Sequence, residues 1–153
     1  MDTKTDTTAA FDMEKMAEAL IREAIRAIDG SHPANPWNRR FGCALQTSSG
    51  RVFASSAFWS DTLSLTLHAE HAALAHAAAH NDRQVVAIAS VPTEDQSGDA
   101  YCHPCGICKQ LIYENSLSSG IDILVLMANF KGKFFARHIS ELDLFPWPAR
   151  HAV

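Results

Sequence analysis

The sequence has no excess of positive charge and no long apolar run, and each absence argues against a class of protein. Lysine and arginine number 13 against 17 aspartate and glutamate residues, which gives a formal net charge of −4. Nucleic-acid binding usually needs a strong basic excess, so a nucleic-acid partner is not expected. The longest apolar run, 121–128, contains Asp122 and is too short to span a bilayer. The first ten residues are polar and lack the apolar segment of a secretory signal, so we expect a cytoplasmic protein.

Cysteine is also scarce, with four residues in the chain, but Cys102, Cys105 and Cys108 lie close together. This spacing suits metal binding in a reducing compartment better than a framework of disulfides. The chain shows no internal repeat, low-complexity segment or linker, and 153 residues suffice for one ordinary domain. We expect a flexible N-terminus over residues 1–10 and a single domain over 11–153.

The pattern of apolar residues predicts three helices and five strands. Apolar side chains recur at three-to-four spacing over 11–28, which is typical of an amphipathic helix, and Asp29-Gly30 provides a stop. Two further helices are expected, an alanine-rich one over 66–80 and another over 105–116. The predicted strands are 41–46, 52–58, 85–91, 121–127 and 134–139. The order α-β-β-α-β-α-β-β favours an α/β fold in which helices pack on a central sheet of about five strands.

Two short motifs, His68-Ala69-Glu70 and Pro104-Cys105-Gly106-Ile107-Cys108, carry the chemistry. Together they supply one imidazole, two thiols and a carboxylate that is not needed as a ligand. Three protein ligands that leave a fourth position open are typical of catalytic zinc. H-x-E followed by P-C-x-x-C is the signature of zinc deaminases that act on nucleobases. The motifs therefore predict a catalytic zinc site formed by His68, Cys105 and Cys108.

The positions of these residues near predicted helix starts support this interpretation. Cys105 and Cys108 are three residues apart, so one helical turn brings both sulfur atoms to the same face. A helix N-terminus also lowers the pKa of a thiol and favours the thiolate that zinc requires. We expect Glu70 to be the catalytic residue, a proton shuttle between zinc-activated hydroxide and an aminated heteroaromatic ring that releases ammonia.

The sequence resembles the cytidine deaminase family in three stretches, which are Phe41-Gly42-Cys43-Ala44-Leu45, Thr66-Leu67-His68-Ala69-Glu70 and Pro104-Cys105-Gly106-Ile107-Cys108-Lys109-Gln110. The resemblance covers roughly residues 14–146 and is nearer to nucleoside deaminases than to the branches that act on nucleic acid. It implies a three-layer α/β/α sandwich with a central mixed sheet, one zinc per subunit and a homodimer or homotetramer. It also implies that the backbone at Ala69 contacts a small-molecule substrate, and that the chain belongs to nucleoside metabolism.

The region that binds the sugar in nucleoside members of this family is different here. Those members carry an Asn-x-Glu pair on the second strand, whereas residues 47–67 contain no asparagine and no glutamate. The pair falls on Ala57 and Trp59, or on Ser55 and Ala57, and neither alignment restores its hydrogen bonds. We therefore expect a cytidine-like or modified nucleoside or base as substrate, with ordinary cytidine not preferred.

Other residues are candidates for substrate contact. Arg39 and Phe41 align with the family's first-strand substrate positions, and the guanidinium at 39 could stack on a flat ring or pair with an anionic group. His103 flanks the cysteine motif and could line the mouth of the pocket. Trp147 could reach the pocket of a neighbouring subunit.

Several alternatives stay open. The chain could be a nucleic-acid-editing deaminase of the same fold, or a non-enzymatic protein in which Cys102 completes a structural zinc site. The C-x-x-C-x-x-C spacing that Cys102 creates also occurs in iron–sulfur loops, although no further cysteine completes that pattern. Surface or packing roles are expected for His71, His76 and His80. In relatives with three cysteine ligands, an arginine follows the catalytic glutamate and offsets the extra negative charge. Here two thiolates and a neutral imidazole already balance the charge of Zn²⁺, so no positive charge is required at His71.

Overall fold

Five strands form one mixed sheet in the order β2-β1-β3-β4-β5. The computed structural model describes residues 4–32, 39–93 and 97–142. Strand β1 pairs antiparallel with both β2 and β3, β3 and β4 are parallel, and β4 and β5 are antiparallel. The strands are β1 (Phe41–Thr47), β2 (Val52–Ser56), β3 (Val85–Pro92), β4 (Leu124–Ala128) and β5 (Phe134–His138).

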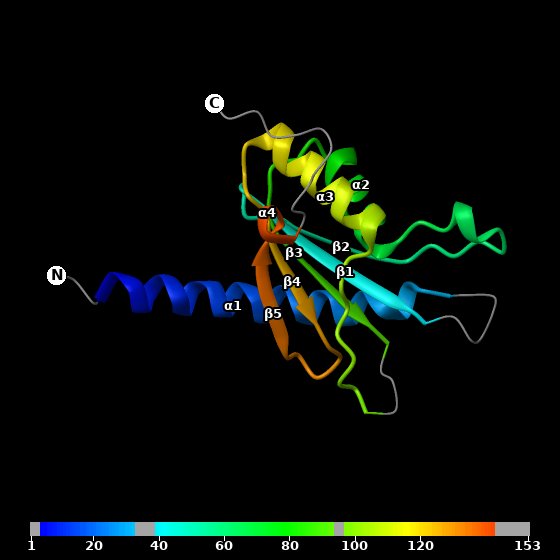
Figure 1. Ribbon diagram of the computed structural model, residues 1–153, viewed down its shortest axis with the longest axis horizontal. Helices are drawn as coiled ribbons and strands as arrows, with labels where there is room; N and C mark the ends of the chain where they lie inside the picture. The colour runs from blue at the N-terminus through cyan, green and yellow to red at the C-terminus, as the bar shows by residue number, and fades with distance from the viewer. Residues whose placement is uncertain (1–3, 33–38, 94–96, 143–153) are drawn as a thin grey trace.

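Helices cover both faces of this sheet and make the expected three-layer sandwich. Helix α1 (Lys4–Ala27) lies across one face, and α2 (Ala69–Ala79) and α3 (Gly106–Ser119) lie on the other (Figure 1). A short helix, α4 (Ile139–Leu142), follows β5, and single 3₁₀ turns occur at η1 (Ile28–Gly30) and η2 (Leu63–Leu65). Helix α1 begins at Lys4, so it overlaps the N-terminal segment that the sequence predicts to be flexible. No helix among the described residues is long and apolar enough to cross a membrane.

Side chains alternate between the two faces of the sheet along each strand, and this alternation divides the core into two clusters. On β1, Cys43 and Leu45 join the cluster against α2 and α3, whereas Ala44 joins the cluster against α1. On β3, Ile88 belongs to the first cluster, and Ala87, Ala89 and Val91 belong to the second. Because successive side chains on a strand point to opposite faces, each apolar strand is buried on both sides.

Gly42 allows α1 to approach the sheet closely. A Cβ atom at this position of β1 would overlap the main-chain oxygen of Ala24 on α1. Only glycine fits there, so the glycine of the Phe41-Gly42-Cys43 stretch has a packing role on the face opposite the helices that carry the two motifs.

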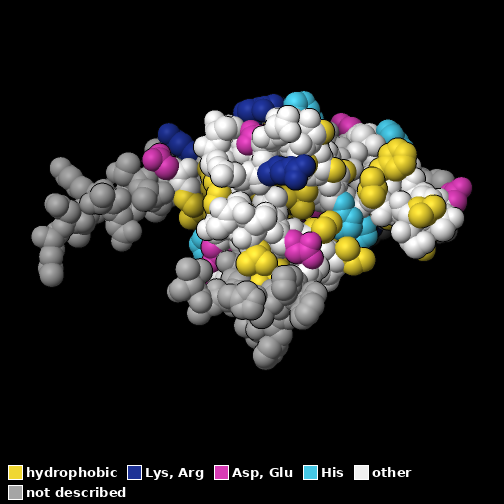
Figure 2. All heavy atoms as spheres, turned by 90° about the horizontal axis from the view of Figure 1, so that it is seen from above, with side chains coloured by type: hydrophobic (Ala, Val, Ile, Leu, Met, Phe, Trp, Pro, Cys, Tyr) yellow, Lys and Arg dark blue, Asp and Glu magenta, His cyan; other side chains and the backbone are white. Residues whose placement is uncertain are grey.

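The segment between β2 and α2 has a different structure from the one expected. Phe58 and Leu67 pair with each other as an isolated antiparallel bridge, so β2 ends at Ser56 and α2 begins only at Ala69. The strand predicted over 52–58 is therefore shorter, and so is the helix predicted over 66–80. Hydrophobic side chains gather at the end of the molecule that carries this segment (Figure 2), and the exposed ones are Phe58, Leu63, Leu65 and Leu67.

Two further boundaries differ for local reasons. The last predicted strand ends one residue early, because Ile139 begins α4. Strand β4 begins at Leu124 instead of residue 121, because the residues before it hold α4 in place. The Asp122 carboxylate accepts hydrogen bonds from the main-chain N–H and the hydroxyl of Ser140, at 3.2 and 2.6 Å.

Candidate metal centre and active site

The N-termini of α2 and α3 meet at one end of the sheet. His68 is the residue before α2 and Cys105 is the residue before α3, and both have extended backbone conformations. The first N–H groups of a helix have no partner within it, and its N-terminus carries a partial positive charge. The two helices therefore direct positive potential and their first side chains to the same place.

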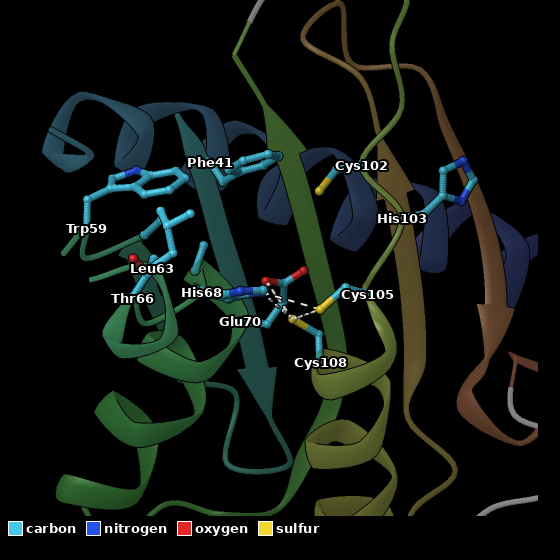
Figure 3. A pocket seen from close by; sticks show the side chains of 12 residues that line it. Phe41, Trp59, Leu63, Thr66, His68, Glu70, Cys102, His103, Cys105 and Cys108 are labelled. Carbon is cyan, nitrogen blue, oxygen red and sulfur yellow. Dashed lines mark hydrogen bonds between the residues drawn. The ribbon is translucent and has the colours of Figure 1, made fainter. Parts of the chain in front are cut away.

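Three potential ligand atoms lie together at this place (Figure 3). His68 Nδ1 is 3.3 Å from Cys108 Sγ and 3.4 Å from Cys105 Sγ, and the two sulfur atoms are 3.4 Å apart. In a tetrahedral zinc site with Zn–S of about 2.3 Å, neighbouring ligand atoms lie roughly 3.5–3.8 Å apart. The observed triangle is slightly smaller, so a zinc ion fits it with small movements of the side chains. Among the described residues, no other group of three or more His, Cys, Asp or Glu has its ligand atoms this close.

The chemistry of these donors fits a cation. Burial raises the pKa of the Cys108 thiol, and the neighbouring Glu70 and Cys105 raise it further. Cys108 lies one turn inside α3, buried beside a carboxylate, so the lowering of a thiol pKa that is expected at a helix start does not prevail for this residue. A divalent cation reverses this balance, since it stabilises the thiolates and offsets the repulsion among them. Two thiolates and one imidazole are a ligand set that zinc favours.

Glu70 lies beside the three ligands, in the first turn of α2. Its side chain is buried, with only 5% of the residue exposed. The Ser90 hydroxyl donates a hydrogen bond to Glu70 Oε1 at 3.1 Å, and Glu70 Oε2 lies 3.4 Å from Cys108 Sγ. A carboxylate fixed in this way, next to a metal and outside its ligand set, is placed for proton transfer. Sequence reasoning did not identify Ser90, because it lies within the apolar strand β3.

His71 contacts two of the candidate ligands, whereas a surface or packing role was expected from the sequence. Its ring stacks on that of His68, with centroids 4.9 Å apart and planes 7° from parallel. Its Nε2 lies 3.6 Å from Cys108 Sγ. Burial and the neighbouring His68 lower the pKa of His71, and Glu70 acts in the opposite direction. His76 and His80 are exposed as expected and pack around the Phe53 ring.

A cavity of about 300 Å³ opens next to the ligands and Glu70. Of the residues predicted from the sequence to contact substrate, five line it, and Arg39 does not; Arg39 is exposed at the surface. The lining also includes Leu63, Thr66 and Cys102, which sequence reasoning did not place there. The predicted residues that line the cavity are Phe41, Ala57, Trp59, Ala69 and His103.

Cys102 and His103 lie apart from the ligand triangle, although both line the cavity (Figure 3). Cys102 is buried, and this burial raises the pKa of its thiol well above the usual value. It does not belong to the group of candidate ligands, so the described residues do not supply a fourth protein ligand from this position. The His103 ring points away from the ligands, and its Nδ1 lies 3.3 Å from Met127 Sδ. Trp147 lies outside the described residues.

Comparison with known proteins gives the same picture. Residues 14–122 match the family model for the cytidine and deoxycytidylate deaminase zinc-binding region. The chain is 32% identical to a cytidine deaminase of Halalkalibacterium halodurans over 126 residues, which are 82% of this chain and 89% of that protein. It is also similar to the crystal structure of cytidine deaminase from Burkholderia pseudomallei, with a TM-score of 0.71 and 27% identity over 84% of this chain and 97% of the other. The fold is shared with the cytidine deaminase from Mycobacterium tuberculosis, with a TM-score of 0.68 and 21% identity over 86% of this chain and 96% of the other. The chain therefore belongs to the cytidine and deoxycytidylate deaminase family and is a zinc-dependent deaminase.

Proposed function

We propose that the chain hydrolyses the exocyclic amino group of a small cytosine-type ring and releases ammonia. The observation that carries this proposal is the arrangement at the end of the cavity, where His68, Cys105 and Cys108 adjoin the buried Glu70. These three residues would hold the zinc ion, which would lower the pKa of water and supply hydroxide near neutral pH. The free volume beside these residues gives a planar ring access to both the ligands and the carboxylate.

Glu70 carries the protons in this scheme. Its carboxylate accepts a proton from the attacking water, and a C–O bond forms at the ring carbon that holds the amino group. Glu70 passes the proton to the adjacent ring nitrogen. It then takes the remaining proton from the new hydroxyl group and delivers it to the leaving nitrogen as the C–N bond breaks. One water is consumed and one ammonia is released, and the ring carbon becomes a carbonyl. The Ser90 hydroxyl holds one carboxylate oxygen, so the other is left beside the reacting atoms.

The remaining predictions about partners fit this proposal. A small-molecule nucleoside or base suits the volume of the cavity, and the net charge of −4 favours neither a nucleic-acid substrate nor an editing role. We also propose a homodimer or homotetramer, in line with the resemblance to nucleoside deaminases. The cytoplasmic location stays a prediction.

The test is ammonia release by the wild-type protein and by Glu70→Gln, with cytosine-type compounds as substrates. General acid–base catalysis contributes about 10²–10⁴-fold, so kcat should fall by that factor while the zinc content stays the same. Glu114→Gln, an exposed change on α3, is the matched control and should keep full activity. Full activity in Glu70→Gln would overturn the proposed role, and no ammonia from any of the compounds would overturn the proposed function.

A further inference from the structure

The end of the cavity farther from the ligands is lined mainly by carbon. Phe41, at the start of β1, and Trp59, after β2, lie away from the triangle formed by His68, Cys105 and Cys108 (Figure 3). Ala57 and Leu63 complete this part of the lining. Leu63 is 67% exposed, so it forms the lip of the cavity where a substrate enters. We call the four residues Phe41, Ala57, Trp59 and Leu63 the apolar wall.

Among the described residues that line this end, the polar side-chain atoms of Trp59 and Thr66 are already used within the protein. The Trp59 indole N–H donates a hydrogen bond to Ser31 Oγ at 3.1 Å, and Ser31 is fully buried. The Thr66 hydroxyl accepts a hydrogen bond from the main-chain N–H of Ser60 at 3.1 Å and donates one to the Ser60 main-chain oxygen at 3.4 Å. The indole therefore presents its ring, and not its N–H, to a substrate.

Two main-chain hydrogen bonds also tie this part of the lining together. Ala57 N–H donates to the main-chain oxygen of Phe41 at 3.1 Å, which ties the end of β2 to the start of β1. The N–H of Thr66 donates to the main-chain oxygen of Leu63, also at 3.1 Å. A hydroxyl group buried against this wall would lose its hydrogen bonds to water and find carbon surfaces in their place, which is unfavourable.

These contacts define the chemical class that suits the far end of the cavity. A substrate whose amino group lies at Glu70 directs the opposite side of its ring, where N1 of a cytosine lies, toward the apolar wall. Aromatic rings such as Phe41 and Trp59 bind flat or apolar groups well. The volume of about 300 Å³ is at the lower end for ligand cavities and suits two small joined rings.

We propose that this site takes a cytosine-type ring with an apolar substituent at N1, in preference to one with a ribose. The inference rests on the proposed function, because it assumes that the reacting amino group lies at Glu70. Trp59 is then a specificity-determining residue, and its hydrogen bond to Ser31 fixes the orientation of the indole ring.

The experiment compares ammonia release from cytosine, 1-cyclopentylcytosine and cytidine by the zinc-loaded wild-type protein. The cyclopentyl compound has a ring of ribose size without its hydroxyl groups, so it isolates the effect of polarity. An apolar pocket discriminates against one added hydroxyl by about 10²-fold, so kcat/KM for 1-cyclopentylcytosine should exceed that for cytidine by at least that factor. An equal or higher value for cytidine would overturn the inference and leave the proposed function intact. No ammonia from any of the three compounds would overturn both.

Two variants locate the preference at Trp59. Trp59→Phe keeps an aromatic ring and should keep the preference for the cyclopentyl compound, whereas Trp59→Ala should lower it at least tenfold through a higher KM. Zinc content and far-UV circular dichroism report whether each variant is folded, and both should match the wild type. If Trp59→Ala is folded, binds zinc and keeps the full preference, Trp59 does not determine specificity.

Discussion

Ser90 offers a sharp test of how the active site is held together. Its hydroxyl donates to Glu70 Oε1 at 3.1 Å, and each of the two residues is only 5% exposed, so water has little access to take its place. A hydrogen bond to a charged group contributes about 1.5–3 kcal/mol. Each 1.36 kcal/mol in the barrier changes the rate about tenfold. If this bond keeps Glu70 in its reactive orientation, Ser90→Ala should lower kcat by roughly 10- to 150-fold.

The assay measures kcat for ammonia release together with the zinc content of each variant. Ser90→Thr keeps the hydroxyl and suits a strand, so it should recover most of the activity. Ser118→Ala, an exposed change on α3, controls for the loss of a serine hydroxyl elsewhere. A Ser90→Ala protein that holds zinc and stays within threefold of the wild-type kcat would refute the reasoning. Equal losses of kcat in Ser90→Ala and Ser90→Thr would also refute it.

Three further predictions concern the metal, the packing and the pH dependence of stability. His71→Ala removes a ring that lies 3.6 Å from Cys108 Sγ, so zinc affinity measured by chelator competition should fall by about 10–100-fold, and unchanged affinity would contradict this role. Gly42→Ala places a methyl group against the Ala24 carbonyl oxygen, so urea unfolding should show a loss on the order of 3 kcal/mol, and wild-type stability would refute the close approach of α1. Hydrogen bonds from the Ser49 and Thr47 hydroxyls, together with the nearby Arg51, lower the pKa of Asp82. The ionised carboxylate therefore stabilises the fold at pH values above its unfolded pKa of about 3.9. This stabilisation is lost as the pH falls through the lower folded pKa. Asp82→Asn should therefore destabilise the protein at pH 7 and much less at pH values below its folded pKa, and an equal effect at both would contradict this.

The sequence alone identified the residues that lie together at the candidate metal site, His68, Cys105 and Cys108, because they belong to two short motifs. Cys105 and Cys108 are one helical turn apart, so local structure alone brings them to one face. His68 and Glu70 are close in space because both lie at the start of α2. The two motifs meet in space as expected. The alternation of helices and strands predicted helices packed on a central sheet, and the resemblance to cytidine deaminases implied the three layers.

The parts that the sequence did not predict depend on contacts between distant segments. Ser90 lies in an apolar run, and nothing in that run shows that β3 places its hydroxyl under Glu70. The bond from Trp59 to Ser31 joins segments that only the folded chain brings together. Arg39 was a candidate because of its alignment alone, and its exposed position shows that alignment does not determine the direction of a side chain next to a loop.

The most direct test of the account is a zinc titration of the metal-free protein, followed by ammonia release from a cytosine-type substrate. The rate should rise in proportion to added zinc and reach its limit at one zinc per chain, because His68, Cys105 and Cys108 form one site. Cys105→Ser should weaken zinc binding and lower the rate at limiting zinc. Ammonia release that is complete without zinc, or that needs a second equivalent, would contradict the claim that this one site carries the reaction.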